Sequence, residues 1–174
     1  MRWRRSVLGV AFVFLASVNA SAAAPAGDGA KLLDSFKDWF VYSAGKGADR
    51  TCFAVSMPTE TTPTNVKRGT VSFLISSWPA QKKKDEPSIV AGYPYKAMSK
   101  AVVQIGSDKF EFGQVMNDGA WMEIPADEQK LIAAMKLGSQ MSITGTSARG
   151  TLTRDNYSLA GISAALEKLD ASCK

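Results

Sequence analysis

The sequence has no histidine in its 174 residues, and this absence removes several kinds of chemistry. Without an imidazole there is no Ser-His-Asp or Cys-His catalysis and no histidine metal ligand. Two cysteines are too few for a zinc cluster. The adjacent carboxylates Asp85 and Glu86, and Asp127 and Glu128, are explained by a solvated loop and by a first helical turn. We therefore expect no catalytic residue, no metal site and no cofactor.

Long apolar runs are also scarce, and the one that stands out lies at the N-terminus. Residues 7–16 are apolar, basic residues precede them, and small residues after them offer cleavage after Ala22 or Ala24. This layout predicts a signal peptide over residues 1–24 and Sec-dependent export to the periplasm or cell envelope, or secretion. The alternative is an uncleaved N-terminal anchor, although a comfortable membrane span needs about 20 apolar residues. After cleavage we expect no stable membrane span.

The formal net charge of +5 belongs largely to this N-terminal segment. Cleavage removes Arg2, Arg4 and Arg5 and no acidic residue, which leaves 18 basic against 16 acidic residues. The lysines at 82–84 are followed by two acidic residues and have no aromatic residues between them, which is typical of a solvated loop. We therefore expect no nucleic-acid partner.

Both cysteines, Cys52 and Cys173, lie in the part of the chain that export would deliver to an oxidising compartment. An even pair there predicts one disulfide. Cys173 falls on the same helical face as Ile162, Leu166 and Leu169, so it would project toward the sheet that contains Cys52. The alternative is two free thiols, one of them nucleophilic, but the sequence offers no histidine to activate a thiolate.

Short apolar segments separated by turn residues dominate the rest of the chain and predict about nine β-strands. The predicted strands are residues 38–43, 52–57, 71–76, 88–92, 101–105, 110–115, 120–122, 141–146 and 151–157. One internal helix begins at Pro125 and ends at Gly138, and a C-terminal helix spans about residues 160–171. This pattern predicts an all-β sandwich or partly closed barrel, with a flexible lead-in at residues 25–35 and a single domain at residues 36–174.

Exposed aromatic residues are the best candidates for a binding surface. Tyr93 and Tyr95 flank a proline, which keeps this segment out of a central strand, and Trp78 lies upstream. The rings could instead cover an open end of the sandwich, so both interpretations stay open. Trp39 and Trp121 lie within strand patterns, and we expect them in the core.

Three C-terminal features resemble the invasion-associated locus B family: residues 145–151, residues 155–166 and Cys173. Residues 38–39, 92–94 and 120–121 match as well, and the resemblance covers about residues 36–173. It implies an immunoglobulin-like β-sandwich exported by Gram-negative bacteria and named for a pathogenic member's role in host-cell invasion, with no known reaction or cofactor. Many members carry a further cysteine shortly after the tryptophan, and Tyr42 and Ser43 do not supply it here.

These observations favour a non-enzymatic envelope protein that acts by binding a protein or another envelope component, with a link to host interaction implied by the resemblance. One alternative is an envelope enzyme that uses carboxylates or Ser43 with Lys46, which match a Ser-x-x-Lys motif. That motif needs a helix, whereas this segment leaves a strand and contains glycine. Another alternative is a small-ligand carrier with an aromatic site formed by Trp78, Tyr93 and Tyr95.

Overall fold

The computed structural model describes residues 29–173, which form twelve β-strands, two α-helices and two short 3₁₀ turns. The strands are β1 (Lys31–Phe36), β2 (Trp39–Ala44), β3 (Thr51–Ser56), β4 (Glu60–Thr62), β5 (Ser72–Trp78), β6 (Lys83–Val90), β7 (Ala101–Ile105), β8 (Asp108–Phe112), β9 (Gln114–Met116), β10 (Gly119–Trp121), β11 (Gln140–Thr146) and β12 (Leu152–Ser158). The helices are α1 (Pro125–Leu137) and α2 (Ile162–Ser172), and the 3₁₀ turns are η1 (Gly47–Asp49) and η2 (Pro79–Gln81). The predicted signal peptide lies outside the described residues.

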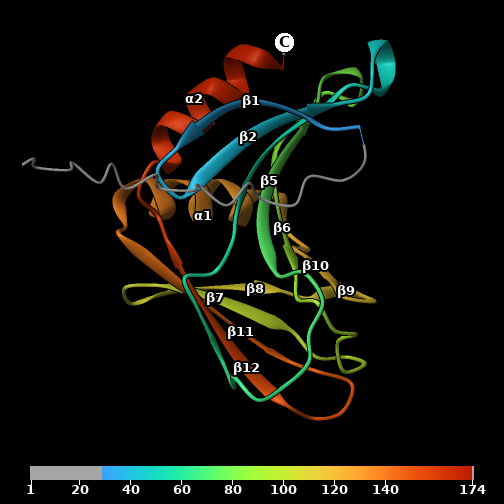
Figure 1. Ribbon diagram of the computed structural model, residues 1–174, viewed down its shortest axis with the longest axis vertical. Helices are drawn as coiled ribbons and strands as arrows, with labels where there is room; N and C mark the ends of the chain where they lie inside the picture. Colours follow the sequence, from blue (N-terminus) through green and yellow to red (C-terminus); the bar gives the residue numbers. More distant parts are fainter. Residues whose placement is uncertain (1–28, 174) are drawn as a thin grey trace, which may run out of the picture.

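The strands form two antiparallel sheets. The seven-stranded sheet has the order β1-β2-β3-β5-β6-β10-β9, and the five-stranded sheet has the order β4-β12-β11-β7-β8. In Figure 1 the five-stranded sheet occupies the lower half of the molecule, and its strands run across the direction of β5 and β6. Side chains from both sheets enter one hydrophobic core, which confirms the predicted all-β sandwich.

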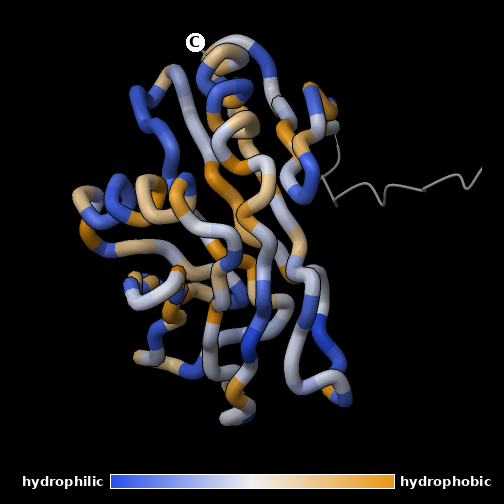
Figure 2. The backbone as a smooth tube through the Cα atoms, turned by 90° about the vertical axis from the view of Figure 1, so that its left-hand side faces the viewer, coloured by the Kyte–Doolittle hydropathy of each residue, from blue (hydrophilic) through white to orange (hydrophobic). Residues whose placement is uncertain are grey.

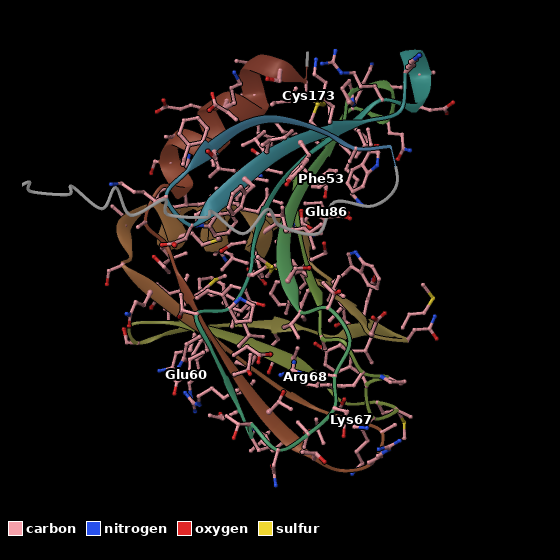
Figure 3. All side chains as sticks on the ribbon, in the orientation of Figure 1. Phe53, Glu60, Lys67, Arg68, Glu86 and Cys173 are labelled. Atoms are coloured by element: carbon pink, nitrogen blue, oxygen red, sulfur yellow. A yellow bond between two sulfur atoms is a disulfide. The ribbon has the colours of Figure 1, made fainter. Side chains whose placement is uncertain are left out.

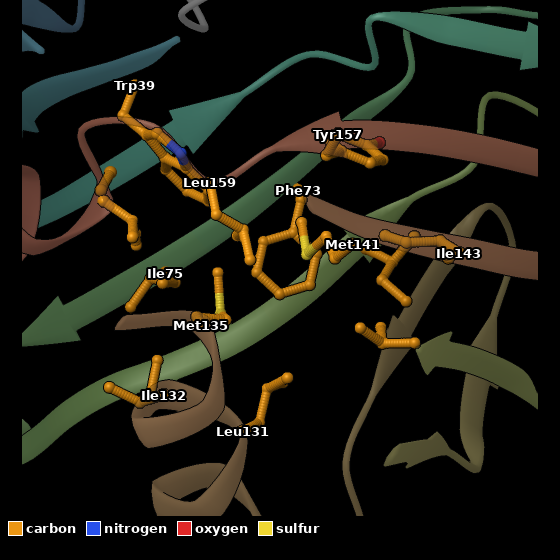
Figure 4. Close-up of a cluster of buried hydrophobic side chains, with 14 of the residues drawn as sticks. Trp39, Phe73, Ile75, Leu131, Ile132, Met135, Met141, Ile143, Tyr157 and Leu159 are labelled. Carbon is orange, nitrogen blue, oxygen red and sulfur yellow. The ribbon is translucent and has the colours of Figure 1, made fainter. Parts of the chain in front are cut away.

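The core is built by the alternation of side chains along the strands. Trp39 of β2, Phe73 and Ile75 of β5 and Met141 of β11 are fully or almost fully buried, and they meet α1 residues such as Met135 (Figure 4). The predicted core position of Trp39 is confirmed, and its indole nitrogen donates a hydrogen bond to the Ser158 carbonyl at 3.1 Å. Hydrophobic segments concentrate inside the molecule, and hydrophilic ones follow its loops (Figure 2).

Both predicted helices are present and cover part of the inner face of the seven-stranded sheet. Pro125 occupies the first turn of α1, and Gly138 follows its last residue, so the predicted start and stop are confirmed. α1 contacts β6 and β8, whereas α2 contacts β1, β2 and β3. The apolar stripe of each helix therefore closes the core where the five-stranded sheet does not reach.

Three predicted boundaries differ from the structure. Residues 31–35, which we expected in a flexible lead-in, belong to β1, because this segment pairs with β2 as an edge strand. The charged segment after residue 82 is not a loop. β6 begins at Lys83, and its first half, which includes Glu86 and Pro87, pairs with β5. The predicted strand 110–115 is broken at Gly113, so that β8 joins one sheet and β9 joins the other.

The predicted disulfide is confirmed and ties the end of α2 to β3. Cys52 and Cys173 are bonded with their Cα atoms 5.9 Å apart and a sequence separation of 121 residues. Cys52 is fully buried in the central part of the seven-stranded sheet, and Cys173 packs against the same core. The alternative of two free thiols is therefore wrong.

Candidate functional site

The seven-stranded sheet has a second, outer face that the helices and the five-stranded sheet do not cover. Trp39 and Val41 of β2 enter the core, so Phe40 and Tyr42 point to the opposite side. The strand register extends this face in a row across the sheet: Phe40, Val55, Leu74, Ser88, Trp121 and Gln114 are successive cross-strand partners. A neighbouring row contains Tyr42, Phe53, Ser76 and Glu86.

Apolar side chains gather on the β2–β3–β5 part of this outer face. We call Phe40, Tyr42, Phe53, Val55, Met57 and Leu74 the aromatic patch. The rings of Tyr42 and Phe53 are stacked, with centroids 5.5 Å apart and an interplanar angle of 16°. Phe40, Phe53 and Leu74 are half-buried, whereas Tyr42 and Val55 are buried, with 4% and 1% of their surface exposed. Ala30, which precedes β1, also packs against the patch.

The outer face of the five-stranded sheet has the opposite character. Its outward side chains are mostly polar, with Val102 and Leu152 as apolar exceptions. Arg154 donates to Ser142 at 3.4 Å, and Asn156 donates to Glu60 at 2.9 Å. Along β12, buried residues alternate with these more exposed ones, which is the pattern of a strand with one solvated face. The aromatic patch is therefore a property of one sheet face and not of the whole surface.

Three lysines lie at the end of the outer face next to the β5–β6 turn, and two of them form ion pairs. Lys82 is exposed and forms no ion pair within residues 29–173. The ammonium of Lys83 lies 5.6 Å from the ring centroid of Trp78 and also forms an ion pair with Glu86. Lys84 forms an ion pair with Asp170 of α2 at 2.9 Å, which raises the pKa of that lysine. A partner with acidic groups beside an apolar surface would suit this combination.

Of the three aromatic residues predicted to form one surface, the structure brings Tyr93 and Tyr95 together and leaves Trp78 apart. The two tyrosine rings meet edge to face with centroids 5.5 Å apart. Trp78 ends β5, whereas the tyrosines follow β6, whose last residue pairs with the first residue of β5. About six residues of extended strand, or about 20 Å, therefore separate them.

Tyr93 and Tyr95 belong to a buried polar cluster between the sheets. Tyr93 shares a hydrogen bond of 2.7 Å with Thr153, and the guanidinium of Arg68 lies 4.9 Å from its ring centroid. Arg68 donates to both carboxylate oxygens of Asp155, at 2.6 and 2.7 Å. Figure 3 places Arg68 in the lower half of the molecule, away from Phe53.

The ionisation of this cluster is set by burial and by the ion pair. Burial raises the pKa of both Tyr93 and Tyr95, so both phenols stay protonated at neutral pH. Burial alone would lower the pKa of Arg68, but the hydrogen bonds and charge of Asp155 raise it. The cluster therefore contains one permanent ion pair and two neutral phenols, which suits a structural link between sheets more than a reactive centre.

The residues considered for catalysis lie in β2, in the segment after it, in β6 and in α1. Ser43 is in β2 opposite Cys52, and Lys46 is exposed beyond the strand end, with no hydrogen bond between them in the described part of the chain. Asp85 has a raised pKa, first because it is buried and then because Asp170 is near. Asp127 of α1 forms an exposed ion pair with Lys130 at 2.8 Å.

The aromatic patch was not predicted, although its signal is present in the sequence. β2 and β3 carry large apolar residues at both odd and even positions, which indicates strands with two buried faces. Trp121 was expected in the core, but it is half-buried on the outer face, in the row that begins with Phe40. From the sequence, each aromatic residue was assigned separately to the core or the surface, whereas the strand register decides which face of the sheet each ring occupies.

Comparison with known proteins gives one match. A family model described as Invasion associated locus B (IalB) protein matches residues 39–170, which is most of the chain and spans both sheets and both helices. Neither the curated proteins nor the solved structures contain a significant match.

Proposed function

The chain belongs to the invasion-associated locus B (IalB) family, and from this premise we propose that it is an exported, non-enzymatic envelope protein that binds another envelope protein through the aromatic patch. The patch carries the proposal, because apolar side chains gather on the outer face of the seven-stranded sheet, whereas the outer face of the five-stranded sheet is mostly polar. Aromatic residues and methionine are enriched at protein–protein interfaces, and contiguous apolar patches mark such sites.

The composition of the patch also favours a particular class of partner. Phe40, Phe53 and Leu74 lie in adjacent strands and form the apolar centre, while Lys82 and Lys83 lie at the end next to the β5–β6 turn. A partner protein with an apolar surface and acidic residues on one flank would bury the rings and pair with the lysines. The apolar contact would supply most of the binding free energy, and the charges would mainly fix the orientation.

Two observations support export and placement in the envelope. The disulfide between Cys52 and Cys173 is the kind of cross-link that persists in an oxidising compartment. The N-terminal sequence has the layout of a cleavable signal. Within residues 29–173, neither helix has the length and apolar character needed to cross a membrane.

The proposal is tested by partner capture with the mature protein as bait in crosslinked envelope fractions. Phe53→Lys should abolish recovery of the partner, because it places a charge in the centre of the apolar contact. Leu152→Lys is the matched control, since Leu152 is an exposed apolar residue on the other sheet. Circular dichroism and the unfolding midpoint verify that both variants fold. Equal recovery with wild type and Phe53→Lys would contradict the proposal.

A second candidate function, a carrier with a small aromatic site, is favoured by the pairing of Tyr93 with Tyr95. Because Trp78 lies at the other end of β5, that site would have to use the two tyrosines alone. Their hydrogen bonds and burial leave little ring surface for a ligand, so we place the binding function at the aromatic patch.

A further inference from the structure

A groove of about 930 Å³ lies beside the aromatic patch, toward the β9 edge of the sheet. Its walls come from the β9–β10 hairpin, the beginning of β6 and the N-terminal turn of α1. Trp121 and Met116 provide apolar surface, and the side-chain amides of Gln114 and Gln129 lie along it. The groove shares no residue with the aromatic patch, although Lys82 and Lys83 at the end of the patch also line it. It contains Trp121, which was expected in the core and is half-buried on the outer face.

The indole of Trp121, which lines the groove, lies against Gly119 of the same strand. The ring carbon Cζ3 lies 2.7 Å from the position that a Cβ atom on Gly119 would take, so the indole rests directly against the glycine backbone. Gly119 and Trp121 are two residues apart and lie on the same face of β10. Met116 is opposite Gly119 in the register and is 66% exposed, and Gln114 is opposite Trp121. The half-buried indole is therefore flanked by an exposed thioether and an amide.

The charged residues of the groove balance one another. The lysines at 82–84 face three carboxylates, Glu86, Glu123 and Glu128. Lys83 forms an ion pair with Glu86, and burial raises the pKa of Glu128, an effect that Lys83 partly offsets. A polyanion or a polycation would meet as many repulsive as attractive charges here. A neutral ligand with many hydroxyl groups would instead find both donors and acceptors.

We propose that this groove binds a neutral oligosaccharide, with one sugar ring stacked on Trp121. The C–H groups on one face of a pyranose ring carry partial positive charge and pack against the negative face of an indole. The hydroxyl groups around the ring reach the amides of Gln114 and Gln129 and the surrounding carboxylates and ammonium groups. An apolar platform with a few polar groups around it is the usual composition of a small-ligand site. This site is separate from the aromatic patch, so it does not rest on protein docking there.

Isothermal titration calorimetry of the mature, oxidised protein with cellotetraose, maltotetraose and tetra-N-acetylchitotetraose, three neutral tetrasaccharides, tests the proposal. At least one of these should bind, with a change in tryptophan fluorescence. Trp121→Ala should weaken that binding about tenfold or more, as expected for loss of a central aromatic anchor. Gln114→Ala, which leaves the indole in place, should weaken it less. Phe53→Ala is the matched control: Phe53 is also an aromatic residue half-buried on the outer face, but it lies outside the groove lining and should leave binding unchanged.

The outcomes separate this proposal from the proposed function. Phe53→Lys should lose the protein partner and keep the oligosaccharide, whereas Trp121→Ala should do the reverse. Failure of all three tetrasaccharides to bind at millimolar concentration would overturn the proposal. Equal weakening by Trp121→Ala and Phe53→Ala would overturn it too, because the groove would then not be the site.

Discussion

Replacing Asp155 by asparagine should destabilise the fold by about 3–5 kcal/mol, because removing one partner of a buried ion pair leaves an uncompensated charge. The side chains of Arg68 and Asp155 are only 8% and 5% exposed. Besides the two bonds to Asp155, the guanidinium donates to the Ala91 carbonyl from Nε and Nη2 at 3.1 and 2.8 Å. Those bonds hold Arg68 in place after the substitution, so its charge cannot move into solvent without breaking them.

Urea unfolding of the mature, oxidised domain, followed by circular dichroism, measures this loss. For a domain of this size the slope of the free energy against urea is about 1–3 kcal/mol per molar, so the midpoint should fall by about 1 M or more. The slope itself should stay unchanged, since the substitution removes an interaction from the native state without altering the surface that unfolding exposes.

Two controls distinguish the buried charge from a general loss of hydrogen bonding. Lys100 and Glu111 form an ion pair of 2.6 Å at the surface, and Glu111→Gln should leave the midpoint almost unchanged because solvent screens exposed pairs. The double substitution Arg68→Met with Asp155→Leu should recover much of the lost stability, since it removes both charges. A loss below about 1 kcal/mol for Asp155→Asn would refute the reasoning from burial.

Three further predictions concern the disulfide, the beginning of β6 and the groove. Cys173→Ser should cost about 4–5 kcal/mol in the urea assay, because the cross-link with Cys52 closes a very long loop; an unchanged midpoint would contradict this. Asp85→Asn should stabilise the protein at neutral pH: the raised pKa means that folding favours the protonated carboxyl, so stability falls as pH rises above the ordinary range of an aspartate near 4. The gain should shrink below that range in a pH series, and a gain independent of pH would refute it. Gly119→Ala should cost about 1–3 kcal/mol and shift the fluorescence of the displaced Trp121, whereas unchanged stability would show that the indole does not rest on the glycine.

The sequence predicted the elements with strong local signals. α1 could be placed because a proline begins it and a glycine follows it, and both act within one turn of helix. β7 coincides with its predicted residues because apolar residues alternate along it and a glycine-containing turn follows. These signals need no knowledge of the partners in the fold.

Elements that depend on distant neighbours were missed or misplaced. The first half of β6 contains Lys83, Glu86 and Pro87, which argue against a strand. It is nevertheless a strand because β10 stops opposite Ser88, so Pro87 lies at a locally open edge where its missing N–H costs no ladder bond. Similarly, the strand break at Gly113 becomes evident only because β8, before it, and β9, after it, belong to different sheets.

The candidate site was predicted least well, because it also depends on residues that are distant along the chain. Tyr93 and Tyr95 were chosen for their flanking proline, but their roles depend on Arg68 and Asp155, which lie 25 or more residues away along the chain. The aromatic patch needs the register of β2, β3 and β5, which sets Phe40, Phe53 and Leu74 on one face. Apolar residues at both odd and even positions of a strand predict that both of its faces are buried, but they do not predict what packs against the second face.

Site-specific photocrosslinking in the native envelope tests the central claim most directly. A photoreactive amino acid at position 53, in the centre of the aromatic patch, should give one discrete crosslinked species of higher mass. The same amino acid at position 152, on the polar sheet, should give none. A crosslinked species from position 152 but not from position 53, or none from either, would contradict the assignment of partner binding to the outer face of the seven-stranded sheet.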